Sequence, residues 1–453
     1  MADIYPWIMV FLVAFVVTYL MVPVSRKIAF KIGAVDYPSE RRMNTEVIPR
    51  CGGIALYVGL LAACLAMLIG VRFLGWEAMT FYAIQDVNYI LLITGVTFIF
   101  IVGLVDDITQ LPPITKFVGQ IISASIVVVA GVSISRVGGI VGTGFINLGW
   151  LDYPISIIFL VAFMNIINLV DGLDGLAAGI VAIIALALLY MVLQRGNVLL
   201  AMLSLALVAV CLAFLRFNFA PASVFMGDSG AYLLGIIVGI IAIAGVVRTR
   251  GLIVSLVPVV IAGVPVLDTL SAIIRRLRSR RPIQENDMEH IHHRMVGGGL
   301  GQREAVLVLY LCSFTLAVIG ILISGTSRTV SLVVLVALAV VLAIVVWRFD
   351  LFKPVLHHYY DGKGRRGLRQ KQRSQSENDE KSGSGGVDPR GNIGESGDVD
   401  DANGNNSSGN GGDAGSSGGG ASNDGSGGNA NNSDSSNADN SGTNNEENSD
   451  TSA

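Results

Sequence analysis

Long apolar runs alternate with short polar segments from the start of the chain to about residue 350. A helix that crosses a bilayer needs about twenty apolar residues, whereas the core elements of soluble proteins do not. The pattern therefore predicts an all-α polytopic membrane protein. We expect about eleven transmembrane helices, near residues 5–24, 53–71, 89–105, 117–135, 154–170, 176–194, 198–215, 231–247, 252–273, 305–323 and 329–347.

The positions of Lys and Arg predict the orientation of these helices. With the N-terminus outside, the inner loops carry fifteen of these residues and the outer loops carry six. The positive-inside rule then places the C-terminus in the cytoplasm. We expect a multi-pass protein of the cell (plasma) membrane. The first apolar run follows Asp3 rather than a basic leader and precedes Arg26 and Lys27, which favours an uncleaved helix over a signal peptide.

Composition divides the chain into three parts. Residues 1–350 form the membrane domain, 351–373 form a basic juxtamembrane segment, and 374–453 form a tail rich in Gly, Ser, Asn and Asp. The tail has fifteen acidic residues and almost no apolar ones, so it cannot bury a core and is expected to be disordered. The basic segment could rest on anionic lipid headgroups. The four cysteines are expected to be reduced packing residues.

Polar side chains collect at the inner ends of the predicted helices. A carboxylate left alone near lipid is costly, so we expect these groups to be paired or bound to a metal ion. They occur in four segments: "GLVDD" with Asp106 and Asp107, "NLVDGLDG" with Asn168, Asp171 and Asp174, "NFAPASVFMGDSG" with Asn218, Phe225 and Asp228, and "HIHHR" with His290, His292, His293 and Arg294.

The acidic segments predict a site for a divalent cation. Asp171 and Asp174 are three residues apart and would share one broad face of a helix. Mg²⁺ prefers oxygen ligands, commonly one or two carboxylates together with substrate phosphates. For any single Asp, a helix cap or loop residue is the alternative, but the grouping on one side favours a common site. Asp106 and Asp107 would point about 100° apart on a helix, so we expect different roles for them.

The basic candidates are suited to bind phosphate, and the amide and aromatic candidates are suited to bind a nucleotide base. The three histidines have neither a Cys nor the His-x-x-x-His spacing of helical zinc sites, so with Arg294 they fit an anion better, and solvent exposure is the alternative. Lys116 either meets a phosphate or snorkels to the interface. Asn218 and Phe225 could read and stack a base, although packing is the commoner role of an aromatic ring at a membrane surface.

With these motifs, the sequence resembles the polyprenyl-phosphate N-acetylhexosamine-1-phosphate transferase superfamily from Val22 to about Leu307. The "HIHHRM" loop is similar to that of the undecaprenyl-phosphate N-acetylglucosamine-1-phosphate transferase branch. The resemblance implies a Mg²⁺-dependent phosphotransferase that moves N-acetylglucosamine 1-phosphate from a UDP-sugar to undecaprenyl phosphate at the cytoplasmic face. It would release UMP and start lipid-linked cell-wall or cell-surface polysaccharide synthesis. A phospho-N-acetylmuramoyl-pentapeptide transferase activity is the alternative.

The resemblance also implies roles for individual residues and partners. The partners would be a UDP-sugar, a polyprenyl phosphate, the membrane and a second copy in a homodimer, but not a nucleic acid. The ion would be Mg²⁺, with Mn²⁺ as a substitute. The implied roles are catalysis for Asp106, Asp107 and Asp171, metal binding for Asp171 and Asp228, and substrate binding for Lys116, Asn168, Asp174, Asn218, Phe225, His290, His292, His293 and Arg294.

One position departs from the family pattern. Asn44 stands where the family usually has a histidine, and a neutral amide cannot become a cation. Charge neutralisation by that side chain is therefore not expected here.

Two other classes of protein compete with the enzyme. An ion-coupled transporter would place acidic residues near mid-span and on both faces, with symmetry between its halves. A scaffold that presents the acidic tail would leave the four polar segments unexplained. The clusters on one side, and the absence of matching halves in the sequence, favour the enzyme.

Overall fold

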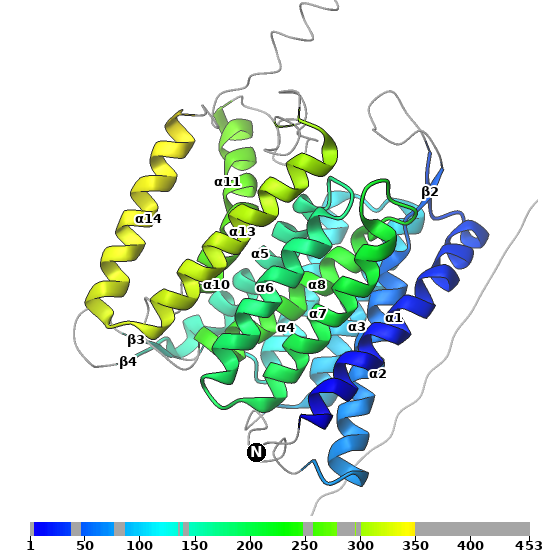
Figure 1. Cartoon of the computed structure of the whole chain (residues 1–453), viewed down its shortest axis with the longest axis horizontal. Coiled ribbons are helices and arrows are strands. Elements are labelled where there is room, and N and C mark those ends of the chain that lie inside the picture. The colour runs from blue at the N-terminus through cyan, green and yellow to red at the C-terminus, as the bar shows by residue number, and fades with distance from the viewer. Residues whose placement is uncertain are drawn as a thin grey trace, which may run out of the picture. The chain divides into compact units, whose positions relative to one another are not determined.

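The computed structural model describes residues 4–37, 47–76, 87–134, 136–138, 145–247, 257–278, 295 and 300–348. Helices dominate this part of the chain (Figure 1). They are α1 (Tyr5–Ile32), α2 (Gly52–Phe73), α3 (Tyr89–Thr109), α4 (Pro113–Val129), α5 (Asp152–Val170), α6 (Leu176–Leu193), α7 (Val198–Asn218), α8 (Gly227–Ile241), the π-helical turn η3 (Ala242–Val246), α10 (Val257–Ile261), α11 (Gly263–Arg278), α13 (Gln302–Gly325) and α14 (Arg328–Arg348).

The prediction of an all-α polytopic membrane protein is confirmed. Among the described residues, eight helices are long and apolar enough to cross a membrane, and Pro113–Val129 and Thr329–Leu342 are shorter apolar helices. The predicted span at 252–273 is occupied from residue 257 onward by α10 and α11, with a break at Ala262. Pro265 has no N–H to donate to the carbonyl group of Ile261, which explains a helix end there. The number of spans and their orientation stay predictions.

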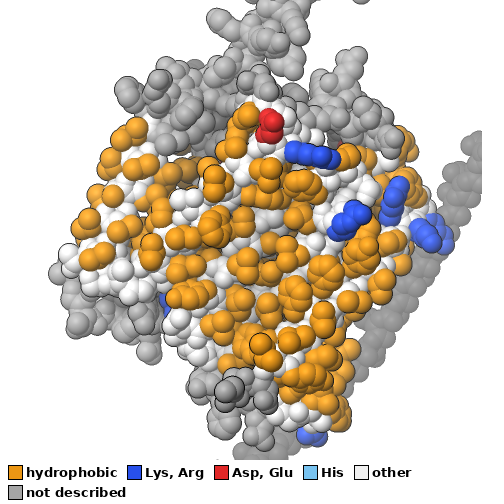
Figure 2. All heavy atoms as spheres, in the orientation of Figure 1, with side chains coloured by type: hydrophobic (Ala, Val, Ile, Leu, Met, Phe, Trp, Pro, Cys, Tyr) orange, Lys and Arg blue, Asp and Glu red, His pale blue; other side chains and the backbone are white. Residues whose placement is uncertain are grey.

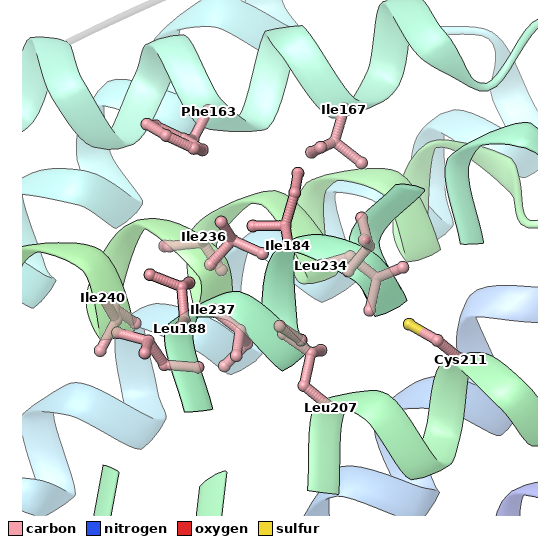
Figure 3. Packing of buried hydrophobic residues seen from close by; sticks show 14 of the residues in the cluster. Phe163, Ile167, Ile184, Leu188, Leu207, Cys211, Leu234, Ile236, Ile237 and Ile240 are labelled. Atoms are coloured by element: carbon pink, nitrogen blue, oxygen red, sulfur yellow. The ribbon is translucent and has the colours of Figure 1, made fainter. Parts of the chain in front are cut away.

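Helix α8 is the centre of the bundle. It packs against α2, α3, α5, α6 and α7, and the α8–η3 stretch is buried from Ser229 to Val246. Figure 3 shows how Ile236 and Ile240 of α8 lie among Phe163 of α5 and Leu188 of α6. Because α8 is enclosed by other helices, whatever its first turn carries is held in a fixed position.

The surrounding helices present apolar side chains outward. Ile90, Ile158 and Leu322 are all more than half exposed, at 79%, 67% and 60%. Figure 2 shows a face covered almost entirely by hydrophobic side chains, with Lys and Arg near its rim. Such a surface matches the hydrocarbon region of a bilayer, and the chain is accordingly a multi-pass membrane protein.

Two short hairpins accompany the helices. Strands β1 (Val35–Asp36) and β2 (Ile48–Pro49) pair antiparallel, as do β3 (Arg136–Gly138) and β4 (Phe145–Asn147), which lead into the 3₁₀ turn η2 (Gly149–Leu151). The end of β2 and the residues after it also form hydrogen bonds with the loop before α8. Phe225 N donates to Pro49 O at 2.8 Å, and Gly52 N donates to Phe225 O at 2.9 Å. This pairing brings the first hairpin to the beginning of α8.

Gly235 lets α5 and α8 approach closely. A Cβ atom there would lie 2.6 Å from Met164 Cα and 2.7 Å from Phe163 O, and backbone atoms cannot move aside independently. We expect Gly235→Val to lower the free energy of unfolding by about 1–3 kcal/mol, because it overpacks this contact. The thermal midpoint of the purified protein measures the effect. Gly325→Val is the control, since no atom lies within 4 Å of a Cβ there, and an equal loss in both variants would contradict the prediction.

Candidate active site

The N-terminus of α8 is capped by a side chain from α3. Asp107 Oδ1 accepts a hydrogen bond from Asp228 N at 2.7 Å, and Asp107 Oδ2 accepts from Ser229 Oγ at 2.6 Å and Ser229 N at 3.2 Å. Gly227, just before, has φ +74°, and a Cβ atom there would lie 2.5 Å from Asp107 Oδ2. The chain therefore needs glycine at this turn, and Asp107 holds Asp228 in place.

Asp228 joins three helices at its carboxylate. Its Oδ2 accepts from Lys116 Nζ at 2.9 Å, and its Oδ1 accepts from Asn168 Nδ2 at 2.8 Å. Lys116, in the first turn of α4, also forms an ion pair with Asp106 Oδ2, while Asp106 Oδ1 accepts from Leu111 N at 2.7 Å. Asp106 also shares a side-chain hydrogen bond with Asp228. Both acids therefore contact α8, but Asp106 does so through side chains and Asp107 accepts from the backbone of its first turn.

Asp171, at the end of α5, has a different environment. Among the described residues, no hydrogen bond or ion pair engages its carboxylate. Burial raises the pKa of Asp171 well above its usual range, and the negative charge of Asp228 raises that pKa further, while the positive charge of Arg50 lowers it. A cation beside this carboxylate would reverse the effect, so Asp171 is suited to bind one.

Asp174 and Asn218 hold the loop between α7 and α8. Asp174 Oδ2 accepts from Ala222 N at 2.9 Å. Asn218 is buried, accepts from Gly175 N at 3.1 Å and donates to Val224 O at 2.9 Å. Burial raises the pKa of Asp174, and hydrogen bonds from Ala222 N and the Gln302 side chain oppose that rise. Both side chains thus connect the 171–175 turn to the 219–226 loop.

Helix α13 also forms hydrogen bonds with this turn and loop. Tyr310 OH donates to Gly175 O at 2.6 Å, and Arg303 Nε donates to Ala220 O at 2.8 Å. With the Gln302 contact to Asp174, the first three turns of α13 touch the turn after α5 and the loop before α8. The sequence motifs gave no sign of these contacts, because they depend on tertiary packing.

Arg50 is a site residue that the sequence motifs did not indicate. It follows β2, its Nη1 lies 3.9 Å from Asp36 Oδ1, and a Cβ atom at Gly227 would lie 2.1 Å from its carbonyl oxygen. Its positive charge acts on Asp171. Its place two residues before the glycine pair of "RCGG" was the available signal, since glycines allow the close approach to the loop before α8.

Of the remaining candidates, the structure describes Phe225 only. Phe225 is half-buried, and its backbone is fixed by its bonds to Pro49 and Gly52. The residues His290, His292, His293 and Arg294, together with Asn44, lie outside the described residues, as do the basic segment and the acidic tail.

Two comparisons with known proteins bear on this arrangement. The family described as glycosyl transferase family 4 matches residues 89–246, a range that runs from α3 to the end of η3. A relative from Bacillus subtilis (strain 168) is 35% identical over 356 residues, which cover 78% of this chain and 96% of the relative. The chain belongs to glycosyl transferase family 4.

The names of the relatives share a sugar and a class of lipid acceptor. The Bacillus subtilis protein is named a probable undecaprenyl-phosphate N-acetylglucosaminyl 1-phosphate transferase. A Mycolicibacterium smegmatis protein, 34% identical over 76% of this chain and 88% of its own length, is named a decaprenyl-phosphate N-acetylglucosaminephosphotransferase. A Yersinia pestis protein, 28% identical over 66% of this chain and 79% of its own length, is named an undecaprenyl-phosphate alpha-N-acetylglucosaminyl 1-phosphate transferase. The resemblance to this branch is confirmed.

The charges of this family 4 site favour a bound cation. Five carboxylates (Asp106, Asp107, Asp171, Asp174 and Asp228) meet three described cations, Lys116, Arg50 and Arg303. Within the described ranges, no group of three or more Asp, Glu, His or Cys side chains is already arranged to hold a metal. Mg²⁺ usually takes one or two protein carboxylates and completes its shell with water and phosphate, so this donor set fits it.

The contribution of the Asn218 side chain to stability can be measured by substitution. We expect Asn218→Ala to lower the free energy of unfolding by about 1–3 kcal/mol, because Gly175 N and Val224 O would lose their partner in a buried place. The thermal midpoint of the purified protein reports this loss. Asn197→Ala is the control, since it removes one hydrogen bond at the other end of α7, and an equal or larger loss there would refute the structural role of Asn218.

Proposed function

We propose that this protein transfers N-acetylglucosamine 1-phosphate from UDP-N-acetylglucosamine to undecaprenyl phosphate and releases UMP. The observation that carries the proposal is the convergence of Asp106, Lys116, Asp171 and Asp228 from four helix ends at one end of the bundle. A lipid phosphate and a water-soluble nucleotide can meet only at a membrane surface. We assign that surface to the cytoplasm from the positive-inside rule.

The relatives support the sugar more sharply than the lipid. The names of all three relatives contain N-acetylglucosamine, whereas their acceptors are undecaprenyl phosphate in two and decaprenyl phosphate in one. We therefore propose the same hexosamine for this chain. Undecaprenyl phosphate is proposed because the name of the Bacillus subtilis protein, which shares 35% identity over 96% of its own length, contains it.

The reaction exchanges one phosphoanhydride bond for another. An oxygen of the lipid phosphate bonds to the β-phosphorus of the UDP-sugar, and the bond from that phosphorus to the bridging oxygen breaks as UMP leaves. The second pKa of a phosphate monoester is about 6, so the nucleophile is largely ionised at neutral pH without a strong base. The protein's main tasks are then to position two anions and to offset their repulsion.

The side chains divide these tasks. Asp171 and Asp228 would hold Mg²⁺, which when bound supplies positive charge that offsets phosphate repulsion. Lys116 would contact the diphosphate, because its side chain is more exposed than the side chains of both of its carboxylate partners. Arg50 would add a second cation beside Asp171. Asp106 orients Lys116, and Asp107 orients Asp228, so both act through their neighbours.

The histidine segment is included in the proposal because a short stretch of chain links it to residues that contact the site. Met295, the residue after Arg294, packs against the main hydrophobic core, and Gln302 and Arg303 contact Asp174 and Ala220. Seven residues separate Arg294 from Gln302, so they can span at most about 30 Å. We propose that His290, His292, His293 and Arg294 bind phosphate oxygens.

The activity is tested with the full chain in lipid nanodiscs. We expect UMP release with Mg²⁺, undecaprenyl phosphate and UDP-N-acetylglucosamine, and little with UDP-N-acetylgalactosamine or UDP-N-acetylmuramoyl-pentapeptide. EDTA should abolish the release and added Mg²⁺ or Mn²⁺ should restore it. Decaprenyl phosphate in place of undecaprenyl phosphate tests the acceptor. Release from the pentapeptide substrate alone, or release unaffected by EDTA, would refute the proposal.

The site residues are tested by single substitutions. We expect Asp171→Asn, Asp228→Asn and His292→Ala each to lower the rate of UMP release at least ~100-fold, because each removes charge that positions or neutralises phosphate. Glu304→Gln is the control, since Glu304 is exposed and caps α13 without touching the site. Thermal midpoints verify that the variants fold. Full activity in all three variants would refute the site assignment.

A further inference from the structure

A groove of about 320 Å³ opens between α1 and the end of α7. Its walls are mostly apolar: Val22, Pro23 and Phe30 come from α1, and Phe217 comes from α7. The ring of Tyr19 lies 5.1 Å from the ring of Phe217, measured between centroids, and these two rings connect α1 to α7 beside the groove. The volume is within the range of small-molecule pockets, about 300–1,000 Å³.

Two cations line the same groove. Arg26 and Lys27 are both exposed, and neither forms an ion pair or a hydrogen bond with any residue in the described part of the chain. An unpaired surface cation is ordinary by itself. Here, however, two adjacent cations line a hollow whose other walls are aliphatic and aromatic, so its surface is amphipathic.

The groove is at the end of the bundle that carries the acidic site, but it is separate from that site. Its remaining lining residue, Ser223, donates through both N and Oγ to Phe217 O, at 2.9 Å each. The neighbouring Ala222 N binds Asp174. None of the groove residues is among the carboxylates or cations of the candidate active site. Because α1 ends at Ile32 and α7 ends at Asn218, the groove lies near the ends of two apolar helices, where we expect lipid headgroups.

We propose that this groove binds an anionic phospholipid of the leaflet next to the acidic site. Its phosphate lies against Arg26 and Lys27, and one acyl chain lies along Pro23, Phe30 and Phe217. A soluble anion would leave the apolar walls uncovered, and a zwitterionic lipid would bring its own cation toward Arg26 and Lys27. A second copy of this chain docked by the same surface would bring like charges together.

The lipid would connect two separate parts of the structure. It touches α1 on one side and, through Phe217 and Ser223, the loop that binds Asp174 on the other. This binding site does not depend on the proposed transferase reaction, because α1, α7 and Ser223 line it and none of the proposed catalytic or metal-binding side chains does. Lipid binding can therefore be measured without substrates.

The test is native mass spectrometry of the full chain in mixed micelles with equal amounts of phosphatidylglycerol and phosphatidylcholine. We expect retention of one phosphatidylglycerol in preference to phosphatidylcholine. Arg26→Gln and Lys27→Gln should each weaken this binding roughly fivefold, and the double variant roughly 25-fold. The charge-preserving variant Arg26→Lys should keep it. Lys31→Gln is the matched control, since Lys31 is an exposed cation one turn further along α1 that does not line the groove.

Three results would overturn the proposal. Equal retention of both phospholipids would mean that the cations do not select a headgroup. Equal weakening by Lys27→Gln and Lys31→Gln would mean that general surface charge, and not the groove, attracts lipid. Displacement of phosphatidylglycerol by equimolar undecaprenyl phosphate, lost in the double variant, would assign the groove to the polyprenyl lipid instead.

Discussion

The cap that Asp107 places on α8 is the contact on which the site depends. A helix N-terminus buried inside a membrane protein leaves N–H groups that water cannot reach, and an unpaired buried donor costs about 1–3 kcal/mol. Asp107 satisfies two of these donors and the hydroxyl group of Ser229. Since Asp107 lies in the last turn of α3 and Asp228 in the first turn of α8, this one carboxylate fixes where two helices meet and where Asp228 points.

The site follows from an excess of negative charge at that meeting point. Asp228 accepts hydrogen bonds from Lys116 and Asn168, whereas the Asp171 carboxylate has no hydrogen bond or ion pair among the described residues, and burial disfavours its charged form. The turns that carry these acids are held by Asn218, Arg303 and Tyr310, which bond to backbone groups. The surroundings are therefore held in place while negative charge is in excess, which suits the cation that we propose for this site.

The helices could be predicted from the sequence because lipid imposes a length and a composition on each one. Their ends could not. α4 begins at Pro113 rather than 117, which places Lys116 in its first turn, and 252–273 is divided at Ala262. The acidic residues were visible as motifs, but the pairing of Asp107 with α8 and the place of Arg50 arise from tertiary contacts. The sequence marked Asn218 as a candidate by its residue type alone. Its hydrogen bonds to Gly175 N and Val224 O could be found only from the fold.

The complete enclosure of α8 also bears on how the protein responds to its membrane. Hydrophobic mismatch is relieved where helices touch lipid, by tilting or by local thinning of the bilayer. Here that contact belongs to peripheral helices such as α1 and α13, whereas α8 is buried from Ser229 onward. A thicker or thinner bilayer therefore tilts the outer helices before it displaces the carboxylate at the start of α8.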